Sequence, residues 1–275
     1  MNIFMTGATG QMGNFTIEYL KEFAPQAHLF GLARTQEAAE KLEARGVTAR
    51  IADFADKEKL VKAFEGMDRL LFISIPQANL QANVVAAAKE AGIGYIAYTS
   101  INAIDYPKNG LEHNHRQTEA LIAESGIKHT FLRNSWYLEM EKGPFRAAMA
   151  TGKYYYLSEG KISYATRQEF AEAAARVIAT AAFGEVVELG RDALTHLDIA
   201  RALEIATGKS LETKEVDVET YNAHLSPFAE TGFEIVMQQY VQAGNNGENA
   251  VTKKDFETVL GHPLAPLSEA IKTIL

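Results

Sequence analysis

The stretch TGATGQMG, from Thr6 to Gly13, follows the short apolar run Ile3–Met5 and contains three glycines spaced three residues apart. Glycine is unfavourable inside a strand or a helix, so its repetition here needs a physical reason. At a turn from a strand into a helix, the first glycine allows a tight reversal, the second lets the backbone approach a phosphate, and the third allows close helix packing. Gly7, Gly10 and Gly13 fit these roles.

The spacing G-x-x-G-x-x-G differs from the G-x-G-x-x-G of many dehydrogenases, and a glycine-rich turn without chemical function is the alternative. We favour nucleotide binding because of the context. The turn leads from an apolar strand into a helical pattern in which Met12, Phe15, Tyr19, Leu20 and Phe23 share one face. Amide groups at the start of that helix would point toward a pyrophosphate, aided by the helix dipole.

The first half of the chain alternates between strand-like and helix-like segments. The predicted strands are Asn2–Met5, His28–Ala33, Thr48–Ile51, Arg69–Ser74, Tyr95–Thr99 and His129–Leu132. The predicted helices, after the one that begins near Gln11, are Gln36–Arg45, Lys57–Glu65, Leu80–Ala91 and Glu112–Glu124. Repeated strand–helix–strand units imply right-handed crossovers and a parallel sheet covered on both faces. The sequence therefore predicts an α/β protein with a doubly wound parallel sheet, the Rossmann class.

The pattern loosens after about Trp136. The predicted helices there are Gln168–Thr180, Leu197–Ala206, Tyr221–Ala243 with a break near Pro227, and Leu267–Leu275, and the predicted strands are Glu185–Leu189 and Leu211–Val218. We expect residues 1–135 to form a dinucleotide-binding domain and residues 136–275 a smaller, helix-rich substrate region. Because no linker separates them, the two should pack together around a cleft.

The composition narrows the possible functions. The chain has 275 residues, 47% of them hydrophobic, and it has no cysteine, which excludes disulfides and thiolate chemistry. A net charge of −8 argues against nucleic acid as the main partner. We find no secretory signal and no apolar run of membrane-spanning length, so we expect a cytoplasmic protein that does not act at a membrane. The sequence leaves open whether the chain forms a homo-oligomer.

The end of the second predicted strand points to the choice of cofactor. An NAD site usually places an acidic residue there, whereas an adenosine 2′-phosphate needs a cation. Arg34 stands 21 residues beyond Gly13, and the first acidic residue is Glu37. We favour contact with a 2′-phosphate, hence NADP(H), over an ordinary surface arginine. After the third strand, Asp53 and Phe54 could flank the adenine; a helix cap with a core phenylalanine is an equal alternative.

Ligands bind at the carboxyl ends of parallel strands, which directs attention to two further segments. Ser74 and the turn Pro76–Gln77 end the fourth strand and should lie over the cofactor. Thr99 and Ser100 end the fifth strand and could bind near the nicotinamide ribose, with simple capping of the strand end as the alternative.

The proton donor of ordinary short-chain dehydrogenases is missing. That donor is a tyrosine with a lysine four residues later, and none of the eleven tyrosines has one. The corresponding helix carries His115 with Glu119 at the fourth position. We expect His113 and His115 to be solvated and predict no metal site, because histidines two apart do not share a helix face. His115 could shuttle a proton if it points into the cleft.

Several segments together resemble the NmrA-like group of atypical short-chain dehydrogenases/reductases. They are TGATGQMG, GLAR, ADFAD, IAYTS, FLRNSWYLE and GKISYATR. They are most similar to the bacterial NAD(P)H:quinone oxidoreductase type 2 members, whose relatives include triphenylmethane dye reductases. The resemblance covers most of the chain and is densest from Met1 to Arg167.

The resemblance implies a cofactor, a reaction and a set of site residues. It implies NADPH along the strand ends, with NADH a weaker alternative, and two-electron reduction of a planar conjugated acceptor such as a quinone. The pyrophosphate would be held by the consecutive residues Gly7, Ala8, Thr9, Gly10, Gln11 and Met12, and the 2′-phosphate by Arg34. Further cofactor contacts would come from Pro76, Gln77, Ala78, Ser135, Leu138, Glu139, Met140 and Arg167. Asn134, Trp136 and Tyr137 would border the nicotinamide and the substrate.

This chemistry does not require a strong acid in the protein. A quinone that accepts hydride becomes a stabilised anion, which can take its proton from water, so the site must chiefly hold two flat rings in register. Trp136 and Tyr137 are the preferred aromatic walls, whereas Phe145, Tyr154–Tyr156 and Tyr164 are more consistent with core packing. Two other functions stay open: a redox sensor that binds NADP(H) without turnover, and an isomerase or epimerase.

Overall fold

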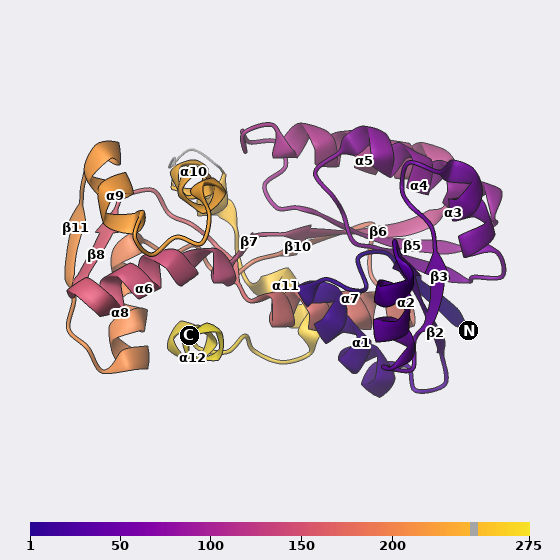
Figure 1. Ribbon diagram of the computed structural model, residues 1–275, viewed down its shortest axis with the longest axis horizontal. Helices are drawn as coiled ribbons and strands as arrows, with labels where there is room; N and C mark the ends of the chain where they lie inside the picture. Colours follow the sequence, from indigo (N-terminus) through magenta and orange to yellow (C-terminus); the bar gives the residue numbers. More distant parts are fainter. Residues whose placement is uncertain (243–246) are drawn as a thin grey trace.

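A seven-stranded parallel sheet forms the centre of the molecule in the computed structural model, which describes residues 1–242 and 247–275 (Figure 1). Its order is β10-β6-β5-β4-β1-β2-β3, and every neighbouring pair is parallel. The strands are β1 (Asn2–Met5), β2 (His28–Ala33), β3 (Thr48–Ile51), β4 (Arg69–Phe72), β5 (Tyr95–Ile101), β6 (Lys128–Asn134) and β10 (Val186–Leu189). The order reverses between β1 and β4, where doubly wound sheets bind ligands.

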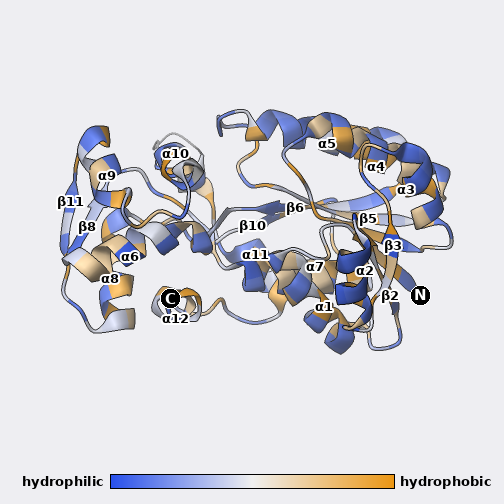
Figure 2. Cartoon of the chain, viewed as in Figure 1, coloured by the Kyte–Doolittle hydropathy of each residue, from blue (hydrophilic) through white to orange (hydrophobic). Residues whose placement is uncertain are grey.

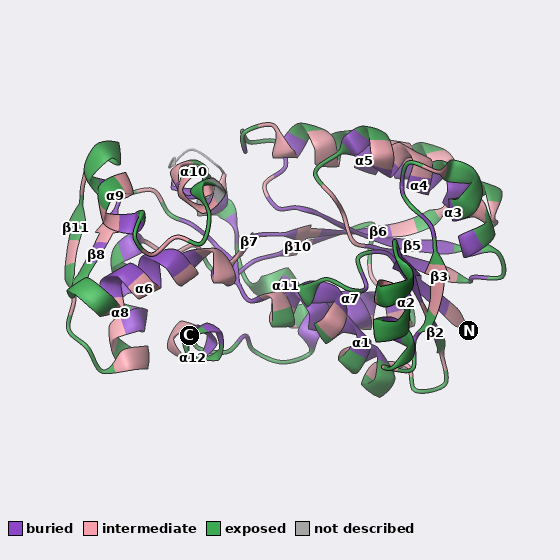
Figure 3. Cartoon of the chain, viewed as in Figure 1, coloured by how far each residue is buried: buried purple, intermediate pink, exposed green. Residues whose placement is uncertain are grey.

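Helices cover both faces of this sheet (Figure 1). On one face lie α1 (Gln11–Phe23), α2 (Gln36–Glu43), α7 (Arg167–Thr180) and α11 (Lys254–Leu260). On the other lie α3 (Lys57–Phe64), α4 (Ala78–Glu90) and α5 (Leu111–Ser125). Strand β5 is buried along its whole length (Figure 3), whereas α2 is largely hydrophilic and buries only Ala39 and Leu42 (Figure 2). The predicted doubly wound α/β class is confirmed.

A smaller body packs at the carboxyl end of the sheet, on the left in Figure 1. Its strands are β7 (Trp136–Tyr137), β8 (Lys153–Tyr156), β9 (Tyr164–Ala165) and β11 (Glu212–Glu215), joined as the pairs β7–β9 and β11–β8. Its helices are η1 (Leu138–Glu141), α6 (Lys142–Thr151), α8 (His196–Thr207), α9 (Val218–Leu225), α10 (Gly232–Val241), η2 (Glu248–Ala250) and α12 (Leu267–Ile274). Of the predicted helix Tyr221–Ala243, the last residue lies outside the described residues.

The chain passes between the two bodies more than once. After β7 and β9 it returns to the sheet through α7 and β10, and later through α11, whose Phe256 stacks on Phe170 of α7 at 5.2 Å. Strand β10, which comes after residue 135 in the chain, pairs with β6 and forms one edge of the sheet. Residue 135 therefore marks where the chain first leaves the sheet, and some later elements still belong to it.

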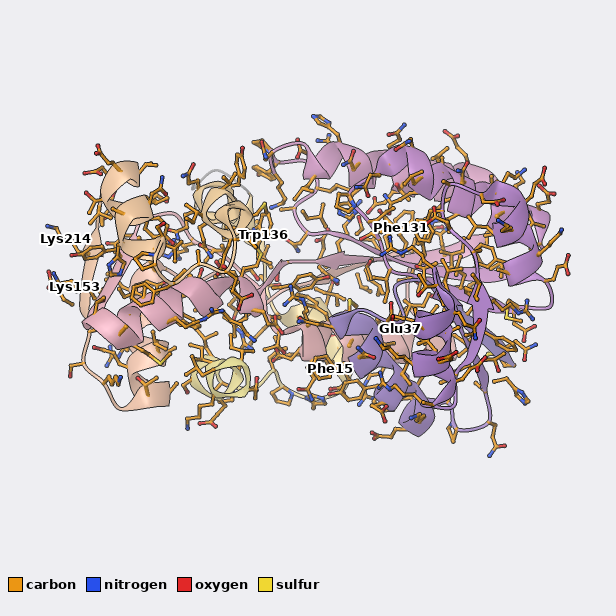
Figure 4. All side chains as sticks on the ribbon, in the orientation of Figure 1. Phe15, Glu37, Phe131, Trp136, Lys153 and Lys214 are labelled. Atoms are coloured by element: carbon orange, nitrogen blue, oxygen red, sulfur yellow. The ribbon has the colours of Figure 1, made fainter. Side chains whose placement is uncertain are left out.

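The predicted buried face of α1 is wrong in one residue. Phe15, labelled in Figure 4, is 40% exposed, whereas Thr16 and Ile17 are buried. The face is rotated because α1 packs against α7 as well as the sheet, so Ile17 and Leu20 fill the contact. No helix within the described ranges is long and apolar enough to cross a membrane.

Candidate functional site

The glycine turn leaves amide groups free at the start of α1. Gly7 has φ +60°, a left-handed conformation that favours glycine, and its carbonyl oxygen accepts from the amide of Gly10. Gly10 caps α1 without any side-chain hydrogen bond, and the first turn carries no acidic residue. Among the described residues, the amides of Gln11, Met12 and Gly13 have no hydrogen-bond partner. These are the donors that an anion at a helix N-terminus would accept from.

The third glycine brings α1 close to the turn itself. A Cβ atom on Gly13 would lie 2.7 Å from the Cα of Ala8 and closer still to the carbonyl oxygen of Gly7. A Cβ on Gly10 would lie 3.3 Å from the same carbonyl oxygen. The turn therefore forms a side-chain-free cradle, and its residues fit a pyrophosphate.

Arg34 lies at the carboxyl end of β2, next to this turn. It is exposed and forms no ion pair or hydrogen bond with any residue that the structure describes. Thr35 accepts from the amide of Ala38 at 3.2 Å and caps α2, so Arg34 is held at the start of that helix. An unpaired guanidinium in this position is suited to an anionic ligand.

The two residues predicted to flank adenine have different surroundings. Asp53 is exposed, and its carboxylate accepts from the amide of Ala55 at 2.8 Å. Phe54 is only 9% exposed and packs edge-on against Phe72 in the core below α3 and α4. In this conformation the ring is largely enclosed by the core, which corresponds to the alternative given above.

A pocket of about 240 Å³ opens at the carboxyl ends of β4, β5 and β6. The predicted site residues that line it are Ser74, Pro76, Thr99, Ser100, Asn134, Ser135, Trp136, Tyr137 and Met140. Gln77 and Ala78, by contrast, begin α4 without lining it, and Leu138 is fully buried in the core of the smaller body. The structure thus brings nine of the predicted residues together around one space at the carboxyl ends of β4, β5 and β6.

Three consecutive residues of this pocket carry polar atoms without partners. The side-chain amide of Asn134, the hydroxyl of Ser135 and the indole nitrogen of Trp136 are buried and lack hydrogen bonds to the described residues. Their residues are 5%, 6% and 8% exposed. Leaving such groups unsatisfied costs about 1–3 kcal/mol each, so this concentration of them is characteristic of a ligand site.

The hydroxyl groups at the ends of β4 and β5 are already engaged with protein. Thr99 accepts from the amide of Ser74 at 2.8 Å and donates to the Ser74 hydroxyl at 3.1 Å. Ser100 donates to Glu119 at 2.6 Å, and Glu119 holds Arg133 by two hydrogen bonds of 3.0 and 2.7 Å. The Glu119 carboxylate raises the pKa of the Arg133 guanidinium above its usual range. These hydrogen bonds hold the ends of β4, β5 and β6 together where they line the pocket.

A second pocket, of about 320 Å³, continues the cleft toward α1. Met140 lines both pockets, and Gln11, Glu139 and Arg167 line the second. The Arg167 guanidinium carbon lies 4.7 Å from the centre of the Tyr137 ring, and Glu139 accepts from the Arg167 amide at 2.9 Å. Gln11 at the start of α1 thus lines one pocket, Tyr137 and the strand ends line the other, and Met140 lies between the two.

The expectation that both histidines of α5 are solvated is wrong for His115. His113 is exposed, but His115 is partly buried, lines the first pocket, and places Nδ1 2.9 Å from the hydroxyl of Tyr98. Burial lowers the pKa of His115 to about 4, so its ring is neutral at pH 7. The sequence did offer one indication of a position at the site, because His115 lies in the first turns of the helix that follows β5. Nowhere in the described chain do three or more metal-binding side chains gather.

Most of the remaining aromatic candidates pack in the core, as the preferred interpretation of the sequence predicts, whereas Tyr155 is only partly buried and packs against the ring of His224. Tyr154 and Tyr164 are fully buried and donate to the carboxylate of Glu141 at 3.0 and 2.6 Å, and Phe145 is also fully buried. Trp136 differs, because it lies where the sheet meets the smaller body (Figure 4) and lines the pocket.

Comparison with known proteins agrees with this geometry. Residues 1–255 match the NmrA-like family. Quinone oxidoreductase 2 of Escherichia coli (strain K12) is 35% identical over 277 residues, which cover 98% of this chain and 97% of the relative. The crystal structure of the NADPH-dependent quinone oxidoreductase from E. coli, complexed with NADPH, matches with a TM-score of 0.89 over 99% of both chains at 35% identity. The Citrobacter sp. triphenylmethane reductase complexed with NADP(H) matches with a TM-score of 0.88 over 100% of both chains at 31% identity. The fold, the cleft and these matches together establish that the chain belongs to the NmrA-like family.

Proposed function

We propose that the protein is a cytoplasmic oxidoreductase that transfers hydride from NADPH to a quinone or a similar planar conjugated acceptor. The observation that carries the proposal is the combination of free amides at the start of α1 with two neighbouring pockets that share Met140. One pocket includes Gln11 of α1, and the other is lined by three residues with unpartnered polar atoms. The names of the two relatives at 35% and 31% identity, a quinone reductase and a dye reductase that use NADPH or NADP(H), support this class of reaction.

The residues of the cleft fit a pyridine dinucleotide. The amides of Gln11, Met12 and Gly13 would bind the pyrophosphate, and Arg34 would bind the 2′-phosphate that distinguishes NADPH from NADH. When bound, NADPH supplies a hydride. The protein's own contribution is to fix the position of the two reactants and to exclude water from the space between them.

The first pocket is suited to the flat acceptor. Its lining is mostly apolar and includes the ring of Trp136. The polar atoms of Asn134 and Ser135 are covered in this conformation, so a turn of these side chains would let them bind a carbonyl or carboxamide. We infer that residues 1–135, with α7, β10 and α11, bind the cofactor, and that the rest of residues 136–275 closes the acceptor side.

The missing tyrosine–lysine dyad is consistent with this reaction. The reduced acceptor is an anion with its charge spread over a conjugated ring, so water can supply the second proton. Alcohol–ketone interconversion would need a stronger donor at this place. The dyad's absence therefore favours conjugated acceptors over simple ketones.

Stopped-flow absorbance of NADPH-loaded protein mixed with 1,4-benzoquinone tests the proposal. The expected result is oxidation of bound NADPH well above the rate without protein. Tight NADPH binding with no oxidation by a panel of quinones and triphenylmethane dyes would instead favour the NADP(H) sensor. No binding of either nucleotide would exclude both functions.

A further inference from the structure

The pair formed by Tyr98 and His115 fixes which nitrogen of the histidine ring carries the proton. Tyr98 comes from the buried strand β5 and His115 from the start of α5, and their rings lie 5.8 Å apart. The Tyr98 hydroxyl is 2.9 Å from Nδ1 of His115 and 3.4 Å from Oε1 of Gln81. Hydroxyl hydrogen bonds are typically 2.5–3.0 Å between heavy atoms, so we infer from the shorter distance that Tyr98 donates to Nδ1 of His115 in preference to Gln81.

The surroundings of Gln81 support the same assignment. Its Oε1 already accepts from the amide of Ile75 at 3.1 Å, and its Nε2 donates to Thr118 at 2.9 Å. The Gln81 side chain is thereby held with its oxygen toward Tyr98, at a distance too long for a good bond. With Nδ1 accepting from Tyr98, the neutral ring of His115 carries its hydrogen on Nε2.

Burial keeps both partners in these protonation states. Burial raises the pKa of the Tyr98 hydroxyl above its usual range, so this group remains a donor. His115 stays neutral, and its Nε2 has no hydrogen-bond partner in the part of the chain that the structure describes. His115 is one of the residues that line the pocket, so its ring lies at the acceptor site.

We propose that the Nε2–H of His115 binds a carbonyl oxygen of the acceptor, and that Tyr98 is the positioning residue that holds the ring in this tautomer. This rests on the proposed function and narrows it to acceptors that carry such an oxygen, the quinones. Hydride adds to a ring carbon conjugated to this carbonyl, and the electron pair of the ring C=C moves through the conjugated system onto the carbonyl oxygen. The oxygen becomes an oxyanion that the N–H stabilises, and water supplies the second proton while His115 keeps its own. Later exchange with water moves a proton from that ring carbon to the other quinone oxygen, which restores the aromatic hydroquinone.

Substitution of His115 tests the contact by a binding measurement, which does not depend on turnover. NADP⁺-loaded protein cannot transfer hydride, so it can be titrated with 1,4-naphthoquinone. Trp136 lines the same pocket and is the only tryptophan in the chain, so its fluorescence reports binding. His115→Leu should raise the Kd for naphthoquinone about tenfold and leave the Kd for NADPH unchanged, because one hydrogen bond is lost. In the active protein, kcat/KM for benzoquinone should fall about 10- to 100-fold.

Two further variants separate this role from a structural one. His115→Gln retains a side-chain N–H. Its kcat/KM should therefore be at least about threefold higher than that of His115→Leu, which is half a decade on the tenfold scale of one such hydrogen bond. His113→Leu is the matched control, since His113 lies on the same helix and is exposed, and it should change neither Kd nor kcat/KM.

The tautomer itself is visible by NMR of protein labelled with ¹⁵N at histidine. Comparison with His115→Gln assigns the His115 signals among the seven histidines. We expect a protonated Nε2 and an unprotonated Nδ1 in the wild type, and in Tyr98→Phe a mixture of both tautomers. That variant should also lower kcat/KM with no loss of NADPH affinity.

The outcomes for the two proposals are distinct. A wild type that does not oxidise NADPH with quinones removes the proposed function, whatever the variants show. A wild type that reduces quinones, together with His115→Leu at the wild-type kcat/KM and Kd, would overturn only the role of His115. A proton on Nδ1 instead of Nε2 would overturn it as well, because Nε2 could then only accept.

Discussion

Gly13 lies directly against the carbonyl oxygen of Gly7, so α1 begins in contact with the backbone of the turn that precedes it. Nothing larger than a hydrogen atom fits between them, and the amides that follow Gly10 are left facing outward. The last glycine of the motif therefore shapes the phosphate cradle itself, in addition to bringing helix and sheet together.

Gly13→Ala should damage both stability and cofactor binding. The added Cβ would collide with the backbone at Gly7 and Ala8, and overpacking of this kind costs about 1–3 kcal/mol. We expect a lower urea midpoint and at least a tenfold weaker Kd for NADPH by calorimetry. The matched control is Gly184→Ala, because a Cβ there has its nearest neighbour at 4.0 Å. Wild-type affinity in the Gly13 variant would disprove the close contact.

Arg34→Asp should change the preference between cofactors. A charge-assisted contact to a phosphate is worth about 1.5–3 kcal/mol, which corresponds to a loss of roughly 10- to 100-fold in NADPH affinity. NADH lacks the 2′-phosphate, so its Kd should change much less. Arg201→Asp, an equal change of charge at an exposed position on α8, controls for the net charge. Equal losses for the two nucleotides would remove the case for a 2′-phosphate contact.

His196→Phe should make the protein more stable, increasingly so as the pH falls. His196 is 2% exposed, stacks on Tyr156 at 5.2 Å, and neither ring nitrogen has a hydrogen bond within the described chain. Burial lowers its pKa from 6.5 to about 4. The unfolded chain then binds more protons than the folded one between pH 6.5 and 4, so this histidine reduces stability progressively as the pH falls through that range.

Urea titrations of both proteins at pH 7, 5.5 and 4 measure the effect. The advantage of His196→Phe in the free energy of unfolding should grow by roughly 2–3 kcal/mol across the series. Groups common to both proteins, including Asp198, cancel in the difference. A constant difference at all three pH values would show that His196 is not held neutral by burial.

Much of the fold follows from the sequence because the sheet is built from short apolar strands with helices between them. The ranges of β1, β2 and β3 agree with their prediction, and the strands of the sheet are parallel as predicted. The face of α1 does not. Periodicity alone placed Phe15 inside, but the contact with α7, which comes 150 residues later in the chain, favours Ile17.

The site shows the same division. The strand ends predicted Ser74 and Thr99 at one site, and the family resemblance added Asn134; all three line the same pocket. The sequence did not predict that His115 is partly buried. Its burial depends on the contact with Tyr98 of β5 and on how closely the start of α5 packs against the sheet. The two-residue strands β7 and β9 carry no pattern that a sequence could reveal, yet their pairing positions Trp136.

A crystal structure of the protein with NADPH tests the central claim most directly. The account predicts the pyrophosphate on the amides of Gln11 to Gly13, the 2′-phosphate at Arg34, and the nicotinamide beside Asn134 and Ser135 with its reactive face open to the Trp136 pocket. A nucleotide bound elsewhere, or one whose nicotinamide lies outside this pocket, would contradict it.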